Sequence, residues 1–139
     1  MPIRTYEVQD PATPAPGGRA VSTLSPYIDL APEIVRQRLI IEGVPAFDIT
    51  DADIERYLTG LGRVTDMVVL TQPVTHRSPL YGWAGWVHWE TSGAHFYAWE
   101  QPRRFFSVDV YTCKAFVPEA AVQYTRDFFL TRNITCREA

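Results

Sequence analysis

The chain has 139 residues, of which 46% are hydrophobic and 21% are charged, so we expect one domain with a packed core and exclude wholesale disorder. The 13 basic and 16 acidic residues give a formal net charge of −3 without any run of lysine or arginine, which argues against a nucleic-acid partner. The apolar runs are much shorter than the roughly 18 residues of a membrane span, so no membrane partner is expected.

The N-terminal region differs in composition from the rest of the chain. Residues 9–19, "QDPATPAPGGR", are rich in proline, alanine and glycine, which is typical of an extended linker. We predict a mobile arm over residues 1–23 and a single domain over residues 24–139. No signal peptide is visible, and we expect a cytoplasmic protein with free thiols, a Cys113–Cys136 disulfide being the less favoured alternative.

The first predicted elements are a strand and a helix. Residues 38–47 predict a strand, because three consecutive apolar residues lie between turn-forming ones. A helix is predicted over residues 51–61, with Thr50 as its N-cap and Gly60 and Gly62 as its end. Its apolar residues follow the helical spacing i, i+3, i+4, i+7: Ile54, Tyr57, Leu58 and Leu61.

Four further strands, a helix and a last strand complete the chain. The strands are predicted over residues 65–74, 82–92, 94–100 and 105–116, the helix over 118–130 and the last strand over 133–138. This order, β-α-β-β-β-β-α-β, predicts an α+β two-layer sandwich: a mainly antiparallel sheet with two helices on one face.

Strand alternation predicts which side chains share a face of this sheet. If strand 82–92 stays regular, one face carries Trp86, His88, Glu90 and Ser92. The next strand places His95, Tyr97 and Trp99 on one face. Strand 105–116 separates a side with Phe106, Val108, Val110 and Thr112 from a side with Ser107, Asp109, Tyr111 and Cys113.

On their own, these residues favour no single chemistry. His76, His88 and His95 lack the paired spacing of a zinc site, so no metal is expected. His88, Glu90 and Ser92 could serve acid–base chemistry, although a solvated strand face is the commoner interpretation. The aromatic residues belong to a core or an interface by default, and some could stack on a purine or a sulfonium ion.

The segment from His76 to Cys113 resembles the prokaryotic S-adenosylmethionine decarboxylase family. That family carries H-R-x-x-P-Y-G-x-x-G, then E-S-H, H-T-W-P-E and D-x-x-T-C. Here His76-Arg77 is followed by Pro79, Tyr81-Gly82 and Gly85. Without a gap, the same spacing aligns Ser92 with the family serine and Trp99 with its tryptophan. One inserted residue then aligns Asp109 and Thr112-Cys113 with the last motif. With the order of elements, the resemblance covers residues 38–138.

The resemblance implies a specific chemistry. In the family the proenzyme cleaves itself before the serine, which becomes a pyruvoyl group that serves as an electron sink in decarboxylation. Ser92 and the proton-donating Cys113 match. Three positions depart from the pattern: Thr91 replaces glutamate, Gly93 replaces histidine and Tyr97 replaces the processing histidine.

Three functional hypotheses are compatible with this pattern. The favoured one is a divergent enzyme that binds S-adenosylmethionine or a similar amino-acid substrate without a pyruvoyl cofactor and performs lyase or cyclisation chemistry. The second is a pyruvoyl-dependent decarboxylase of S-adenosylmethionine, arginine or ornithine, and the third is a non-catalytic ligand-binding or partner subunit. The pathway would be polyamine biosynthesis or specialised metabolism.

The same resemblance supplies the candidate site residues. Glu90 and His95 are possible replacements for the missing groups. The catalytic candidates are Ser92, Cys113, Glu90, His95, Tyr97 and His88. The candidates for substrate binding are Tyr81, Trp86, Trp99 and Asp109. The family also implies a homodimer with sites at or near the subunit interface.

Overall fold

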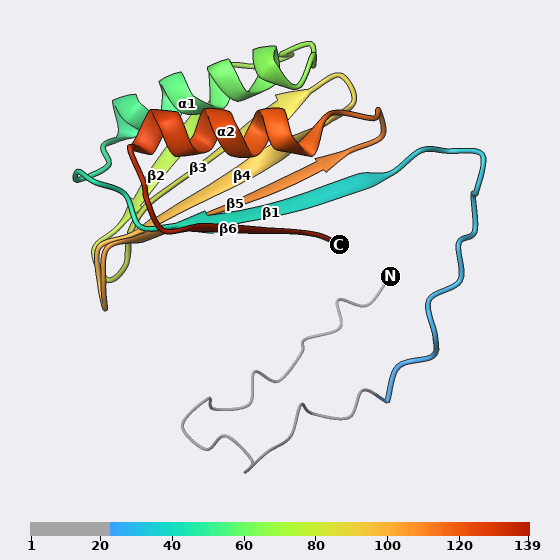
Figure 1. Cartoon of the computed structure of the whole chain (residues 1–139), viewed down its shortest axis with the longest axis horizontal. Helices are drawn as coiled ribbons and strands as arrows, with labels where there is room; N and C mark the ends of the chain where they lie inside the picture. Colours follow the sequence, from blue (N-terminus) through green and yellow to red (C-terminus); the bar gives the residue numbers. More distant parts are fainter. Residues whose placement is uncertain (1–22) are drawn as a thin grey trace. The chain divides into compact units, whose positions relative to one another are not determined.

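The computed structural model describes residues 23–139, and the chain divides into two units, Met1–Leu30 and Ala31–Ala139. Residues 23–30 contain no helix or strand, and their side chains are exposed. The predicted arm lies almost entirely outside the described residues, so both it and the domain boundary at residue 24 remain predictions. The second unit contains every helix and strand of the described residues (Figure 1).

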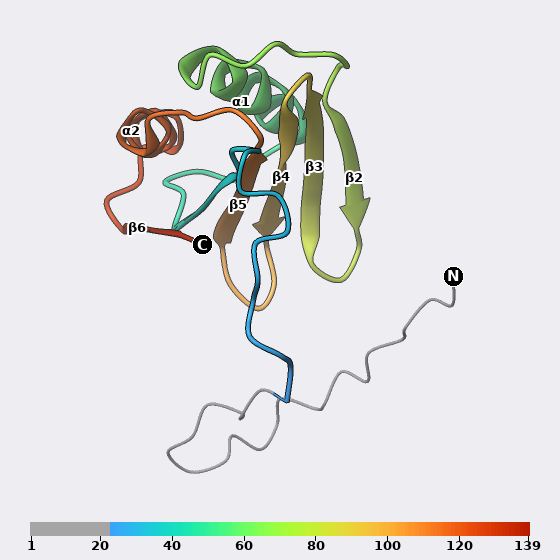
Figure 2. The ribbon, with the colours of Figure 1, turned by 90° about the vertical axis from the view of Figure 1, so that its right-hand side faces the viewer.

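The second unit has two layers, a six-stranded sheet and a pair of helices. The sheet order is β2-β3-β4-β5-β1-β6 and all neighbouring strands are antiparallel. Both helices cover the same face of the sheet (Figures 1 and 2). The elements are β1 (Gln37–Gly43), α1 (Asp51–Val64), β2 (Val74–Ser78), β3 (Gly82–Trp89), β4 (Ser92–Trp99), β5 (Phe105–Thr112), α2 (Pro118–Phe129) and β6 (Ile134–Glu138). The predicted α+β sandwich is confirmed.

The first helix begins as predicted and ends later than predicted. Thr50 closes a capping box with Asp53, in which each side chain accepts a hydrogen bond from the other residue's backbone N–H. The prediction that Gly60 and Gly62 end the helix is wrong. Gly60 lies against the Tyr124 ring and Gly62 against the Trp89 indole, so both glycines are sites of close packing inside the helix.

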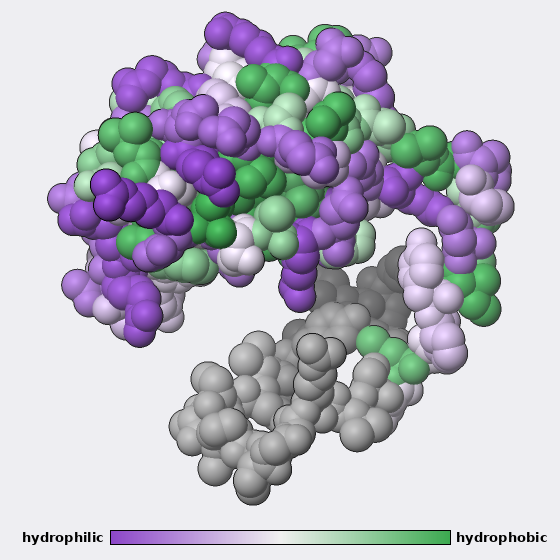
Figure 3. Space-filling model, in the orientation of Figure 1, coloured by the Kyte–Doolittle hydropathy of each residue, from purple (hydrophilic) through white to green (hydrophobic). Residues whose placement is uncertain are grey.

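The core lies between the sheet and the helices and is centred on Tyr57. Its ring contacts Phe96 and Phe129, with ring centroids 5.2 and 4.8 Å away. Its buried hydroxyl is 2.7 Å from Thr125 Oγ1, and burial raises the pKa of the phenol. The four residues that were predicted to share one side of β5 all face the core and are buried: Phe106, Val108, Val110 and Thr112. Figure 3 shows hydrophobic residues gathered between α2 and the sheet, with hydrophilic residues over most of the surrounding surface.

Two strand predictions were wrong in ways that matter for the site. Residues 65–73 are not a strand, and Val69 makes only an isolated bridge to Trp89. Strand 82–92 does not continue to Ser92, because β3 ends at Trp89 and a two-residue turn over residues 90–91 leads into β4. Trp86 and His88 still share a face, whereas Glu90 lies in the turn.

Candidate functional site

One side of the sheet lies away from α1 and α2 and is here called the open face (Figure 2). Most of the predicted site residues line the two cavities on this face. His95 on β4 lies directly opposite Trp86 on β3 and directly opposite Asp109 on β5. One row further along, Gly93 lies between His88 and Tyr111. Cross-strand neighbours of this kind have Cβ atoms about 5 Å apart, so these side chains form one contiguous surface.

A cavity of about 350 Å³, here called the central pocket, lies over these rows. It is lined by Trp86, Val87, His88, Ser92, Gly93, Ala94, His95, Asp109 and Tyr111. Five predicted site residues therefore meet in one pocket, with imidazole and carboxylate groups beside an indole ring. This combination suits a ligand that carries both charge and apolar surface.

A second cavity of about 350 Å³ lies beside it over β2, β3 and β4 and is called the edge pocket. Its lining includes Tyr81, Tyr97 and Trp99. The rings of Tyr97 and Trp99 are 5.8 Å apart, and Tyr97 also lies 6.3 Å from the His95 ring of the central pocket. The two pockets are thus adjacent on one face, and the aromatic walls of the edge pocket provide stacking surfaces.

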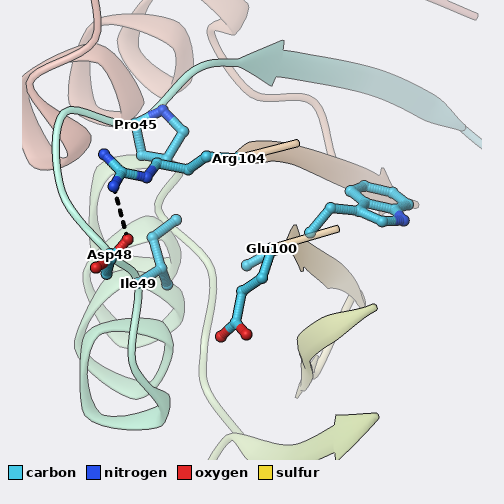
Figure 4. Close-up of a pocket in the computed structure, with 7 residues that line it drawn as sticks. Pro45, Asp48, Ile49, Glu100 and Arg104 are labelled. Atoms are coloured by element: carbon cyan, nitrogen blue, oxygen red, sulfur yellow. Dashed lines mark ion pairs between the residues drawn. The ribbon is translucent and has the colours of Figure 1, made fainter. Parts of the chain in front are cut away.

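A smaller cavity of about 220 Å³ lies at the end of the sheet, near the connections that precede α1 and β5. Arg104 reaches toward Asp48 there, with Nη2 2.8 Å from Oδ1, and Glu100 lies across the cavity from this pair (Figure 4). Of the predicted site residues only Trp99 lines it. Because only one predicted site residue lines this cavity, the open face remains the better candidate site.

The turn between β3 and β4 sets the geometry around Ser92. Ser92 follows the turn with a φ of 121°, a conformation that L-residues rarely adopt. At Gly93 any Cβ atom would overlap the backbone oxygen of Val87, so this position has no space for a side chain. The Thr91 hydroxyl lies 3.0 Å from Met67 Sδ.

Ser92 and Cys113 are brought to neighbouring strand ends. Ser92 pairs with Thr112, and the backbone N–H of Cys113 donates to the Thr91 carbonyl oxygen over 3.0 Å. The Ser92 hydroxyl has no hydrogen-bond partner within residues 23–139. Both Cys113 and Cys136 are free and exposed.

Two of the predicted catalytic residues lie outside both pockets. Glu90 is exposed in the turn, where its N–H donates to the Val68 carbonyl over 2.8 Å, and it does not line either pocket. Cys113 follows the last residue of β5 and likewise lines neither. The structure does not bring these two side chains to His88 and His95.

Two residues of the open face were missed as site residues, Tyr111 of the central pocket and Arg38. Arg38 donates from Nε to Asp109 Oδ1 over 2.9 Å and from Nη2 to Oδ2 over 2.7 Å. The hydrogen bond and the negative charge of Asp109 raise the pKa of the Arg38 guanidinium. The sequence offered one signal: Arg38, Ile40 and Glu42 alternate with the buried residues of β1, which places Arg38 on the same face as Asp109.

Two general findings concern metal ions and membranes. Within residues 23–139 no group of three or more histidine, cysteine or acidic side chains is placed to hold a metal ion. In the same part of the chain, neither helix has the length and apolar character needed to span a lipid bilayer.

Comparison with known proteins assigns the chain to a family. The profile of the S-adenosylmethionine decarboxylase family matches residues 42–139. No curated protein matches significantly. Among solved structures, the crystal structure of the adenosylmethionine decarboxylase from Aquifex aeolicus is similar, with a TM-score of 0.62 and 21% sequence identity over 76% of this chain and 89% of that one. The fold, the order of its elements and the family profile agree, and the chain belongs to the S-adenosylmethionine decarboxylase family.

Proposed function

We propose that this protein binds S-adenosylmethionine or a similar amino-acid substrate on the open face, and that it acts without converting Ser92 into a pyruvoyl group. The turn at Gly93 is the observation that supports an unconverted Ser92. A histidine cannot occupy position 93 unless the backbone shifts, because even a Cβ atom there would overlap Val87 O. The Ser92 hydroxyl has no base within hydrogen-bond distance among the described residues, so its activation as a nucleophile is unsupported.

The two pockets support a substrate with distinct parts. The aromatic edge pocket, with Tyr81, Tyr97 and Trp99, suits a flat ring such as a purine. The central pocket offers Trp86 and Tyr111 to a sulfonium or ammonium group, and Asp109 as a countercharge. The combined shape and chemistry therefore match a nucleoside linked to a cationic amino acid.

The reaction consistent with this site is elimination or cyclisation on the amino-acid chain. A sulfonium is already a good leaving group, so the protein needs only to orient the chain and to supply a modest base. His95 is the favoured base, because it lies in the pocket between Trp86 and Asp109. His88 is the second candidate from the same pocket, and Tyr97 packs edge-on against the His95 ring from the edge pocket.

The test combines calorimetry with a turnover assay. Titration with S-adenosylmethionine should show binding, and mass spectrometry should show a new product that is lost in the His95→Gln variant and retained in an Arg56→Gln control on α1, outside both pockets. Failure of the wild-type protein to bind S-adenosylmethionine, arginine or ornithine would contradict the proposal. Binding without any product would favour a non-catalytic ligand-binding or partner subunit.

One observation favours the pyruvoyl alternative. The Cys113 N–H points at the Thr91 carbonyl oxygen, a contact that would polarise the bond before Ser92. The unusual φ of Ser92 adds strain at the residue that follows this bond. A protein isolated as two fragments that separate between Thr91 and Ser92 would establish this alternative and overturn our proposal.

We further propose a homodimer whose interface includes part of the open face and leaves room for the ligand between the two chains. Several aromatic side chains are strongly exposed there in the single chain: Trp86 is 39% exposed, Tyr97 41% and Tyr111 48%. Clusters of exposed aromatic groups mark interfaces more often than free surface. Light scattering should give twice the chain mass, and Trp86→Glu should shift the protein to the monomer.

A further inference from the structure

The ion pair between Arg38 and Asp109 lies at the border of the central pocket. Asp109 lines the pocket, and Arg38 lies directly opposite Tyr111, which lines it as well. The guanidinium uses Nε and Nη2 for the carboxylate, so that the two planar groups are joined by two hydrogen bonds. This geometry is more specific than that of an ordinary surface ion pair.

Both members of the pair retain unused hydrogen-bonding capacity. Within residues 23–139, Nη1 of Arg38 has no acceptor, and the oxygens of Asp109 accept only from Arg38. The side chains are 46% and 32% exposed, respectively, so a ligand can approach both. A donor group of Arg38 without an acceptor thus lies in the same ion pair as a carboxylate that can accept further hydrogen bonds.

This arrangement is complementary to the head group of an α-amino acid, which carries a carboxylate and an ammonium on the same carbon. We propose that Arg38 and Asp109 bind this head group, with Arg38 Nη1 donating to the ligand carboxylate and Asp109 accepting from the ammonium. The rest of the ligand then lies over Trp86 and Tyr111 in the central pocket. The inference deepens the proposed function and rests on it.

The assignment makes Arg38 a determinant of substrate specificity. Ligands that keep the α-carboxylate should bind more tightly than counterparts that lack only this group. The expected difference is about 10- to 100-fold in Kd, the usual range for one charge-assisted hydrogen bond. Asp109 should not distinguish these two ligands, because both retain the amine.

The experiment measures the Kd of paired ligands by calorimetry. The pairs are S-adenosylmethionine with its decarboxylated form, arginine with agmatine, and ornithine with putrescine. In Arg38→Gln the preference for the carboxylate should disappear, so that the two members of each pair bind with equal Kd, because the carboxylate loses its donor while Asp109 still accepts from the ammonium of both. Asp109→Asn should weaken both members equally, while 5′-methylthioadenosine, which lacks the head group, should bind alike to all variants.

A matched control removes an ion pair elsewhere. Arg56 pairs with Asp53 over 2.6 Å on α1, in the helix layer, and Arg56→Gln should leave every Kd unchanged. An Arg38→Gln protein that keeps the carboxylate preference, or that weakens 5′-methylthioadenosine as much as S-adenosylmethionine, would overturn this inference while the proposed function stands. A wild-type protein that binds none of the ligands would overturn both.

Discussion

Replacing Ser92 by glycine should stabilise the fold. Ser92 has a φ of 121°, a conformation that costs a residue with a Cβ atom about 1–3 kcal/mol. Glycine adopts this conformation without strain, but it lowers the free energy of unfolding by about 0.5–1 kcal/mol because the unfolded chain gains conformational freedom. Because the Ser92 hydroxyl makes no hydrogen bond within the described residues, nothing else is lost, and we expect a net gain of about 1 kcal/mol.

The matched control is Ser92→Ala, which removes the same hydroxyl but keeps the Cβ atom and therefore the strain. Its free energy of unfolding should stay close to that of the wild type. Urea denaturation should show a higher midpoint for Ser92→Gly at an unchanged slope, and the melting temperature should rise by roughly 4 °C. If Ser92→Gly proves no more stable than Ser92→Ala, the positive φ is not a source of strain and the reasoning fails.

Three further predictions concern the same fold. Gly93→Ala should destabilise the protein by about 1–3 kcal/mol in urea, because the new methyl group overlaps Val87 O; an unchanged midpoint would refute the close approach. Thr50→Ala should cost about 1 kcal/mol by removing the capping box with Asp53, and a loss below about 0.3 kcal/mol would contradict it. Burial raises the pKa of Tyr124 from 10.0 to about 12, so the unfolded chain loses the phenol proton at a lower pH than the folded chain does. The contribution of Tyr124 to stability should therefore be constant below pH 10 and fall as the pH rises toward 12. The Tyr124→Phe variant should show a smaller fall in the free energy of unfolding over this range.

The fold was predictable from the sequence where local pattern and tertiary packing agree. The apolar stripe of α1 and the inward side of β5 follow simple periods, and both are buried as expected. The end of α1 was not predictable in this way. Gly60 and Gly62 look like helix stops, but their lack of a side chain serves contacts with Tyr124 and Trp89, which are distant in sequence.

Five of the residues that were predicted for the site line the central pocket, but their arrangement was not predicted. Alternation grouped His95 with Tyr97 and Asp109 with Tyr111, and the register of β4 and β5 shows that His95 and Asp109 lie opposite one another. The turn after β3 breaks the alternation, so Glu90 leaves the face that a regular strand would give it. Arg38 was missed because its partner is on another strand, and a lone arginine on a strand gives no sign of its pairing.

The central claim is that a protein of this family works here with Ser92 intact. Intact-mass analysis of the purified protein, before and after borohydride treatment, tests it most directly. We expect one species near 15.8 kDa that borohydride leaves unchanged. Two fragments that separate between Thr91 and Ser92, the second of them gaining mass with borohydride at its N-terminus, would contradict the claim.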